Sequence, residues 1–207
     1  MGLQLVTPPA LEPVVLADAK NHLRVDVTDD DTLITLLISA ARRYAEAYCE
    51  RSFITQTWKL TLDSFPTGDM AVPFGVPYSL PDSALLLERG AVQSITSIQY
   101  TAMDGTTQTM PPANYAADFS GDLARVTPAF GQIWPIPLPQ IGAVQVTYVA
   151  GYGAAAASVP EGIRQWIMMR TNTLYENREE VAILNRGKVE ALPFIDGLLD
   201  PYRIVRF

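Results

Sequence analysis

The sequence predicts an α+β fold: a helical bundle split in sequence, with an inserted β-rich lobe of short antiparallel strands. Charged residues concentrate at the two ends of the sequence. Residues 1–53 contain 13 charged residues and residues 150–207 contain 14, whereas the longer stretch 54–149 contains only 10. The middle region also holds 10 of the 16 prolines, and prolines with turn glycines are typical of short strands and loops. We therefore expect an N-terminal helical part at 1–53, the β-rich lobe at 54–149, and a C-terminal helical part with a tail at 150–207.

The first region begins extended and continues in two helices. Apolar residues three and four positions apart predict a short helix over residues 16–23. A long helix follows from about residue 30 to 51, and its two neighbouring apolar stripes form a face too wide for a helix exposed on one whole side. The stripes are Leu33, Leu37, Ala40, Tyr44 and Ala47, and Ile34, Ile38, Ala41, Ala45 and Tyr48. Its polar face contains Arg42, Arg43, Glu46 and Glu50, with Arg42 and Glu46 spaced as a helical ion pair.

The middle region predicts five to seven short strands, mostly antiparallel. Residues 54–62 alternate apolar and polar side chains, which indicates a strand. A short apolar run precedes Arg89-Gly90, and the dipeptides Asp104-Gly105 and Gly121-Asp122 are typical of hairpin turns. The alternation of residues 144–148, followed by glycines, predicts a final strand.

The third region predicts one more long helix and a basic, apolar tail. Ser158, Pro160 and Glu161 suit the first turn of a helix. The helix should run to about residue 178 and bury Ile163, Trp166, Ile167, the stem of Arg170 and Leu174. The pattern then weakens, and residues 192–207 indicate a short helical turn and the tail.

Composition narrows the class of protein. No apolar run approaches the roughly 20 residues needed to span a bilayer, and the N-terminus lacks the features of a signal peptide. A single cysteine excludes an internal disulfide framework, so synthesis in a reducing cytoplasm is expected. The net charge of −7 argues against tight nucleic-acid binding. The longest basic cluster, Arg42-Arg43, is expected on a solvated helix face.

The stretch DVTDDDTL, residues 26–33, places four aspartates in eight positions. A calcium loop of the EF-hand type needs a glycine at its sixth position and a glutamate at its twelfth. Counted from Asp26, these positions hold Asp31 and Leu37, so the spacing fails. A helix start fits, because Thr28 or Asp29 can cap the first turn and the helix dipole favours negative charge there.

Other candidate chemistry is sparse. His22 is the only histidine and has no nucleophile motif beside it, and Cys49 is expected in a core or a subunit contact. Gly151-Tyr152-Gly153 lacks the ending of a phosphate loop, and the carboxylates of the stretch YENREE are expected on a solvated face or in a subunit salt link. We expect no conventional enzyme, no cofactor and no metal site.

The apolar, proline-rich loops of the middle region leave two interpretations open. They wrap the β-rich lobe, or they and the tail are contact surfaces in an assembly, where aromatic residues are enriched. An alternative function is a receptor- or carbohydrate-binding module with Trp134 and Tyr152 as stacking platforms. A third is an enzyme that uses the aspartates with a divalent metal, which an unchanged melting temperature in EDTA or calcium would exclude.

The order of several short motifs resembles a known family. A helix of the kind L-x-x-A-K-x-H-L-R, an acidic turn, a long Ala-rich helix and the stretch TQTW come first. The stretches GAVQVTYVAGYG, VPEGIRQWIMM, LYENRE and LPFIDGLLDPYR follow later. Together these motifs resemble the head–tail connector (adaptor, or head-completion) proteins of long-tailed phages over nearly the whole chain. A prophage or a gene transfer agent is an equally compatible source.

The resemblance implies a structural connector. Such proteins form a ring, roughly twelve-fold, that docks on the portal protein of the DNA-filled head and links it to a stopper or tail-terminator protein. The helical part packs subunit to subunit around a channel through which DNA passes without sequence-specific binding. Such a chain is made in the bacterial cytoplasm and assembled at the head–tail interface. By position, the residues expected to contact the portal are Tyr202, Arg203, Ile204, Arg206 and Phe207.

Overall fold

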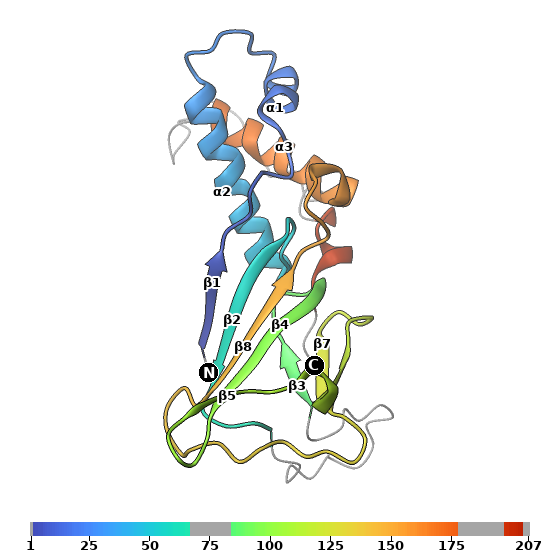
Figure 1. Ribbon diagram of the computed structural model, residues 1–207. Helices are drawn as coiled ribbons and strands as arrows, with labels where there is room; N and C mark the ends of the chain where they lie inside the picture. Colours follow the sequence, from blue (N-terminus) through green and yellow to red (C-terminus); the bar gives the residue numbers. More distant parts are fainter. Residues whose placement is uncertain (1, 67–83, 178–196, 205–207) are drawn as a thin grey trace, which may run out of the picture. The chain divides into compact units, whose positions relative to one another are not determined.

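The computed structural model describes residues 2–66, 84–177 and 197–204. The chain forms two compact units, which Figure 1 shows as a group of helices and a group of strands. The predicted α+β class is confirmed. The sheet unit contains residues 1–8 and 55–151, and the helical unit contains residues 9–54 and 152–207. The N-terminal stretch, which the sequence grouped with the first helical region, therefore belongs to the sheet unit.

The helical unit is built on three α-helices within the described residues. They are α1 (Leu16–Leu23), α2 (Asp31–Cys49) and α3 (Glu161–Glu176). Two 3₁₀ turns accompany them, η2 (Ala156–Ser158) and η3 (Asp200–Tyr202). The short helix has the bounds that the sequence predicts. No helix in the described part of the chain is long and apolar enough to cross a membrane.

The core of the helical unit lies where α2 packs against α3. One of the two predicted stripes of α2 is buried at Ile34, Ile38, Ala41 and Ala45, whereas its last member, Tyr48, is half-buried and the adjacent Cys49 is buried. From α3 the buried apolar residues are Ile163, Trp166 and Ile167. Contrary to the prediction, Arg170 is exposed, and its guanidinium carbon lies 5.9 Å from the centroid of the Tyr44 ring.

The sheet unit contains two antiparallel sheets. The larger has the strand order β1-β2-β8-β4-β5 and the smaller has the order β3-β7-β6. The strands of the larger sheet are β1 (Gly2–Thr7), β2 (Gln56–Leu62), β4 (Val92–Thr101), β5 (Thr107–Thr109) and β8 (Val144–Ala150). Those of the smaller are β3 (Leu85–Leu87), β6 (Tyr115–Asp118) and β7 (Ala124–Pro128), with the 3₁₀ turn η1 (Pro112–Asn114) before β6.

Alternation along the strands builds the core of the sheet unit. On the central strand β8, Val144, Val146, Tyr148 and Ala150 are buried, whereas Gln145 between them is exposed. The buried residues of β3 and β7, namely Leu85, Leu87, Ala124 and Val126, join the same core. The Tyr148 hydroxyl donates to the backbone carbonyl of Glu88 at 2.7 Å, so the one polar atom of this buried ring is satisfied.

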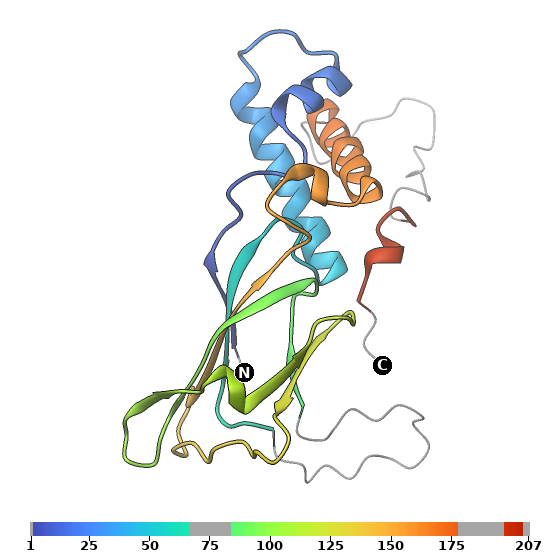
Figure 2. The same ribbon diagram turned by 45° about the vertical axis from the view of Figure 1, so that its right-hand side comes forward.

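Both predicted hairpins form. The turn between β4 and β5 contains Asp104-Gly105, and Gly105 has a φ of 83°, a conformation that glycine adopts without steric cost. The Asp104 carboxylate also accepts the backbone N–H of Thr106 at 2.9 Å. This hairpin extends from one end of the larger sheet, as Figure 2 shows. The second hairpin joins β6 to β7 through Gly121-Asp122.

Candidate functional site

The aspartate run starts α2, as the sequence predicts. The helix begins at Asp31 with Asp30 as its N-cap residue, so the predicted cap, Thr28 or Asp29, is wrong, and the Asp30 side chain makes no capping hydrogen bond. Its Oδ2 instead accepts the hydroxyl of Tyr175, on α3, at 2.6 Å. The Oδ1 of Asp31 pairs with Lys20 Nζ, on α1, at 2.6 Å. The two carboxylates therefore fasten the start of α2 to both of the other helices.

The remaining candidates for chemistry lie apart from one another. His22 is exposed on α1, Cys49 is fully buried at the end of α2, and Glu176 is the last residue of α3. The other carboxylates of the YENREE stretch, Glu179 and Glu180, lie outside the described residues. Among the residues that are described, no group of three or more His, Cys, Asp or Glu side chains is placed to hold a metal ion.

The two aromatic residues of the carbohydrate-binding alternative belong to different units, and each ring already stacks on another ring of its own unit. Trp134 stacks on Phe65, with centroids 4.7 Å apart and ring planes at 6°. Tyr152 packs on Phe53, with centroids 6.5 Å apart. One face of each ring is thus occupied within the chain.

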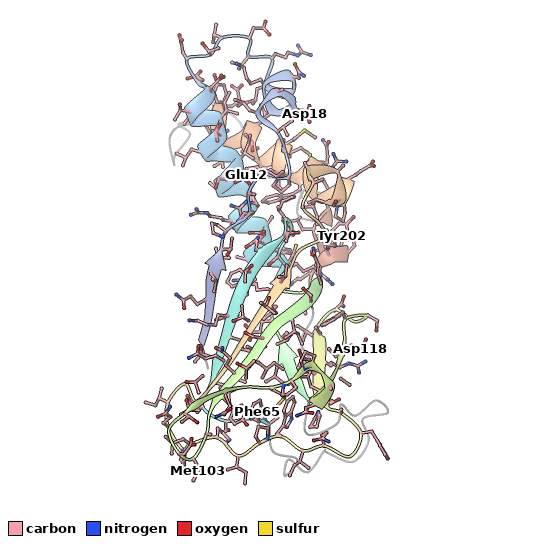
Figure 3. All side chains as sticks on the ribbon, viewed as in Figure 1. Glu12, Asp18, Phe65, Met103, Asp118 and Tyr202 are labelled. Atoms are coloured by element: carbon pink, nitrogen blue, oxygen red, sulfur yellow. The ribbon has the colours of Figure 1, made fainter. Side chains whose placement is uncertain are left out.

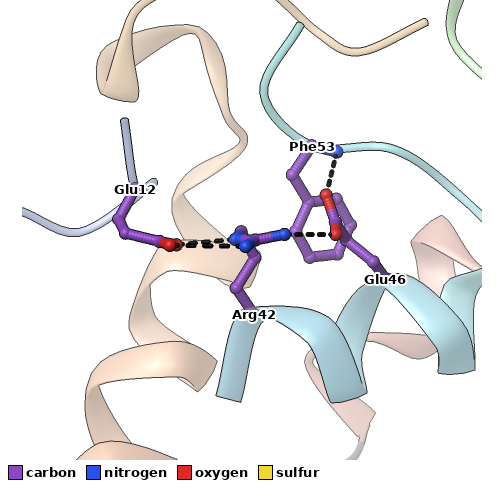
Figure 4. A network of polar contacts seen from close by, with 4 residues as sticks. All are labelled: Glu12, Arg42, Glu46 and Phe53. Carbon is purple, nitrogen blue, oxygen red and sulfur yellow. Dashed lines mark hydrogen bonds and ion pairs between the residues drawn. The ribbon is translucent and has the colours of Figure 1, made fainter. Parts of the chain in front are cut away.

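A buried ion network lies on α2, and Figure 4 shows its four residues. Arg42 Nε donates to Glu12 Oε2 at 2.6 Å, and Arg42 Nη1 donates to Glu46 Oε2 at 2.6 Å. The other oxygen of Glu46 accepts the backbone N–H of Phe53 at 2.9 Å. Burial alone would lower the pKa of Arg42, but the hydrogen bond with Glu12 and the charge of Glu46 outweigh it, so this pKa is raised.

This network corrects one prediction and adds a residue that the sequence did not point to. Arg42 is only 5% exposed, so the prediction that it lies on a solvated helix face is wrong, whereas its neighbour Arg43 is exposed. The predicted pairing of Arg42 with Glu46 is confirmed. Glu12 lies 30 positions from Arg42, and no local pattern could identify it as the second partner.

The segment 197–204 packs on the end of α2. The backbone N–H of Ile204 donates to the carbonyl of Cys49 at 3.1 Å, and the Ile204 side chain is 4% exposed. Arg51 Nε donates to the carbonyl of Tyr202 at 2.5 Å. Asp200 Oδ1 accepts the hydroxyl of Tyr48, from α2, at 2.8 Å. Among the residues predicted to contact the portal, Tyr202 is therefore half-buried, Arg203 is exposed and Ile204 is buried. The other two, Arg206 and Phe207, lie outside the described residues.

Cys49 provides a test of this packing. Its side chain is fully buried, its Sγ lies 3.8 Å from the carbonyl oxygen of Leu199, and burial raises the pKa of its thiol to about 11. At pH 8 only about one thiol in a thousand would be the reactive thiolate. We therefore expect the native chain to resist alkylation by iodoacetamide at pH 8, and the unfolded chain to react at the rate of a free cysteine.

A matched control places the thiol on the open side of the same helix. Ala47 is exposed, so the variant Ala47→Cys combined with Cys49→Ser should be alkylated rapidly without unfolding. Rapid alkylation of Cys49 in the native wild-type chain would show that segment 197–204 does not cover it in solution.

The second predicted stripe of α2 is only partly covered, since its Tyr44 ring stacks on Trp166 of α3 with centroids 5.7 Å apart. We name as the α2 outer stripe the residues Leu33, Leu36, Leu37, Ala40, Tyr44 and Ala47. Leu36 is 65% exposed and Tyr44 is 54% exposed. Ala40 and Ala47 are also exposed, while Leu33 and Leu37 are half-buried. The stripe joins large and small apolar side chains at spacings of three and four, which is the pattern of a helix face that packs against another helix.

Comparisons with known proteins agree on one class. The family model described as "Phage gp6-like head-tail connector protein" matches residues 13–118. Among solved structures, a chain from the neck of an empty gene transfer agent (GTA) particle, computed with C6 symmetry, superposes with a TM-score of 0.78 at 21% identity. A chain from the virion of a native GTA particle gives 0.78 at 22% identity, and one from a native GTA neck computed with C12 symmetry gives 0.75 at 20%.

These similarities extend over whole chains. Each of the three superpositions covers 100% of this chain and 97% of the other. They show that the fold is shared with chains of gene transfer agent particles, two of which come from the neck. A search of the curated proteins found no match.

Proposed function

Because the chain belongs to the family of phage gp6-like head–tail connector proteins, we propose that it is the structural adaptor of a phage-like particle, forming a ring between the portal of the head and the tail. The role rests on assembly, so it needs no catalytic residue. In this proposal the chain is made in the bacterial cytoplasm and incorporated at the neck of a phage, a prophage-encoded particle or a gene transfer agent. The similar GTA necks support the location.

The observation that carries the proposal is the α2 outer stripe. A helix on the surface of a monomer normally turns its polar face outward, because exposed apolar patches are limited to a few hundred Å². Here Leu36, Ala40, Tyr44 and Ala47 lie at the surface, and Arg43 is the one exposed charged residue between positions 36 and 47. A neighbouring subunit packed along α2 would bury this stripe, as the a and d positions of helix bundles are buried.

The ring closes through heterologous contacts, in which the α2 outer stripe of one subunit meets a different surface of the next. The C12 symmetry used for a similar neck supports twelve subunits. The net charge of −7 per subunit disfavours attachment of DNA to the channel wall, so that DNA passes through without sequence-specific binding.

The head-side contact is proposed for the C-terminal residues Tyr202, Arg203, Ile204, Arg206 and Phe207. Ile204 is buried and hydrogen-bonded to the end of α2, so in this proposal it anchors the segment. Arg203 is exposed, with its guanidinium carbon 5.2 Å from the centroid of the Tyr48 ring. Aromatic and arginine side chains are enriched among the residues that contribute most to the binding energy of protein interfaces. The proposed partner of these residues is the portal protein.

Deleting residues 205–207 tests the head-side contact without disturbing the anchor at Ile204. The expected result is a chain that folds with an unchanged melting temperature but is absent from portal-containing heads, because Arg206 and Phe207 are lost. Incorporation is measured by quantitative mass spectrometry of purified heads. The control is Val205→Ala, which keeps both residues and should be incorporated normally. Wild-type levels of the deleted chain in heads would show that the head-side contact lies elsewhere.

A further inference from the structure

The larger sheet is open at both of its edges. Figure 1 shows β1 at one edge and the hairpin of β4 and β5 at the other. β1, with its six residues Gly2–Thr7, pairs with β2 alone, and among the described residues no strand lies against its other side. In an antiparallel pair, every second residue of an edge strand directs its backbone N–H and C=O groups away from its neighbour. β1 therefore presents a row of backbone groups with which a further strand can pair.

The opposite edge is only partly filled. β5 follows the turn that contains Met103, which Figure 3 labels, and it pairs with only the last three residues of β4. Met110 adds one more hydrogen bond to β4, donated by its backbone N–H at 2.8 Å. Pro111 and Pro112 come next, and proline has no N–H with which to continue the ladder. Within the described part of the chain, residues 92–97 of β4 are therefore left without a strand on the side away from β8.

Neither open edge contains the residues that usually keep edge strands apart. Charged side chains and prolines on an edge strand hinder its pairing with another chain. Residues 2–7 (GLQLVT) and 92–97 (VQSITS) contain no Asp, Glu, Lys, Arg or Pro, in a chain with a net charge of −7. Leu5 and Val6 of β1 are 40% and 51% exposed. Two copies can therefore bring these edges together without placing like charges opposite each other.

The two edges also match in the faces on which their side chains lie. Leu3 of β1 and Ile95 of β4 both pack against the core of the sheet unit. Gln4 and Ser97 lie on the outer face, because the strand pairings place both in one row with Thr147, a residue between the buried positions of β8. Joining the two edges would therefore continue the apolar face and the polar face of the sheet across the contact.

The directions of the strands fit a ring. Direction alternates along the order β1-β2-β8-β4, so β1 runs antiparallel to β4. In a ring with the C12 symmetry used for a similar neck, each copy is rotated by about 30° from the next, which is close to the roughly 20–25° twist between adjacent strands. β1 of one copy would thus meet β4 of the next in the antiparallel sense. The two edges are different surfaces of the chain, as the heterologous contacts of a closed ring require.

We propose that β1 of one copy adds to the open side of β4 in the next copy, so that the larger sheets join edge to edge around the ring. This inference rests on the proposed adaptor function and gives its ring a second subunit contact, made by the sheet unit. Backbone hydrogen bonds carry the recognition, as in other complexes in which a strand adds to the edge of a sheet. The joint covers both open edges, each of which could otherwise pair with an unrelated extended chain.

Disulfide trapping in purified particles tests this joint. The variants are Gln4→Cys with Ser97→Cys, and Gln4→Cys with Ser94→Cys, which together cover two registers of pairing on the outer face. Within one copy, three strand spacings separate Gln4 from Ser97, about 14 Å, which is too far for a disulfide. We expect mild oxidation to link the chain of at least one double variant into covalent multimers, up to the whole ring, on denaturing gels without reductant.

The matched control is Gln4→Cys with Thr147→Cys. Thr147 lies in the same row of the outer face but on the central strand β8, away from both edges. This variant and the three single variants at positions 4, 94 and 97 should stay monomeric under the same oxidation. The native Cys49 is fully buried and is present in every variant, so the single variants also control for its reaction.

The other outcomes separate this contact from the adaptor function. Particles that contain both double variants at the wild-type level but give no multimers would overturn the joint and leave the adaptor function standing. Dimers from Gln4→Cys alone would overturn the joint as well, because β1 would then pair with β1 of another copy. Absence of the wild-type chain from particles would overturn the joint and the adaptor function together.

Hydrogen exchange of the wild-type chain tests the same contact without any substitution. The backbone N–H groups of residues 2–7 that point away from β2 are open to solvent in a single copy, and in the ring they would be hydrogen-bonded to β4 of the next copy. We expect their exchange to be roughly tenfold slower or more in particles than in the purified monomer. Equal exchange in the two states would show that β1 remains an open edge in the particle.

Discussion

Replacing Leu36 with glutamate is expected to abolish incorporation of the chain into particles while the chain itself stays folded. Leu36 is 65% exposed, so the substitution leaves the core of the monomer intact. In the proposed ring, however, it would bury one unpaired carboxylate in every subunit contact, and a buried charge without a partner costs several kcal/mol. Because the contact repeats around the ring, the content of the chain in purified particles should fall by roughly a hundredfold or more.

The matched control for this experiment is Val27→Glu. Val27 is 58% exposed and belongs to the segment between α1 and α2, outside the α2 outer stripe. It adds the same charge to the same unit, so it should leave incorporation near the wild-type level. If Leu36→Glu and Val27→Glu are incorporated equally well, the α2 outer stripe is not a subunit contact.

Replacing Arg42 with alanine is expected to destabilise the helical unit strongly, although Arg42 is a charged residue. The change removes the Arg42 guanidinium from the carboxylate of Glu46, which is 8% exposed, and frees Glu12 from α2. Breaking a buried ion pair by removing one partner costs about 3–5 kcal/mol. The free energy of unfolding is measured by urea denaturation, with the far-ultraviolet circular dichroism of the α-helices as the signal. In the described residues these helices all belong to the helical unit.

The adjacent residue provides the control. Arg43 is exposed, and Arg43→Ala removes the same charge from the same helix, so its effect should stay within about 0.5 kcal/mol. Equal effects of the two substitutions would mean that the Arg42 network contributes no more than a surface charge. A charge-preserving Arg42→Lys should recover only part of the loss, because lysine cannot hold both carboxylates in the forked geometry of a guanidinium.

Local patterns explain why much of the fold could be predicted. Ala19 and Leu23 are the buried residues of α1, and the spacing that places them on one face also gives the bounds of this helix. The alternation of Val144, Val146 and Tyr148 identifies β8, because successive side chains of a strand point to opposite faces. The turns at Gly105 and Gly121 locate two hairpins, since turn chemistry depends only on adjacent residues.

Pairings between distant residues could not be predicted from such patterns. β1 is a strand because Leu3 and Leu5 pair with Leu60 and Trp58 of β2, more than 50 positions away. Glu12 likewise reaches Arg42 across 30 positions. The order of the strands and the partner of a buried charge follow from the three-dimensional packing, which short windows of sequence do not report.

The proposed contact surfaces were only partly visible in the sequence. The wide apolar face of α2 is evident, but the sequence does not distinguish the stripe buried by α3 from the more exposed stripe, because each combines two large aliphatic residues, two alanines and one tyrosine. The loop 129–143 shows the same limit. Trp134 turns inward to Phe65 while Ile133 and Ile136 are exposed, so the loop both wraps the sheet unit and presents apolar side chains.

Electron microscopy of purified particles from the strain that encodes this chain tests the proposed connector role most directly. A reconstruction at the neck should contain a ring of this fold between the portal and the tail, with α2 of each subunit against its neighbour. The symmetry of the ring then gives the number of subunits. Particles whose neck lacks this fold, or in which the chain lies at another site of the virion, would contradict the proposed role.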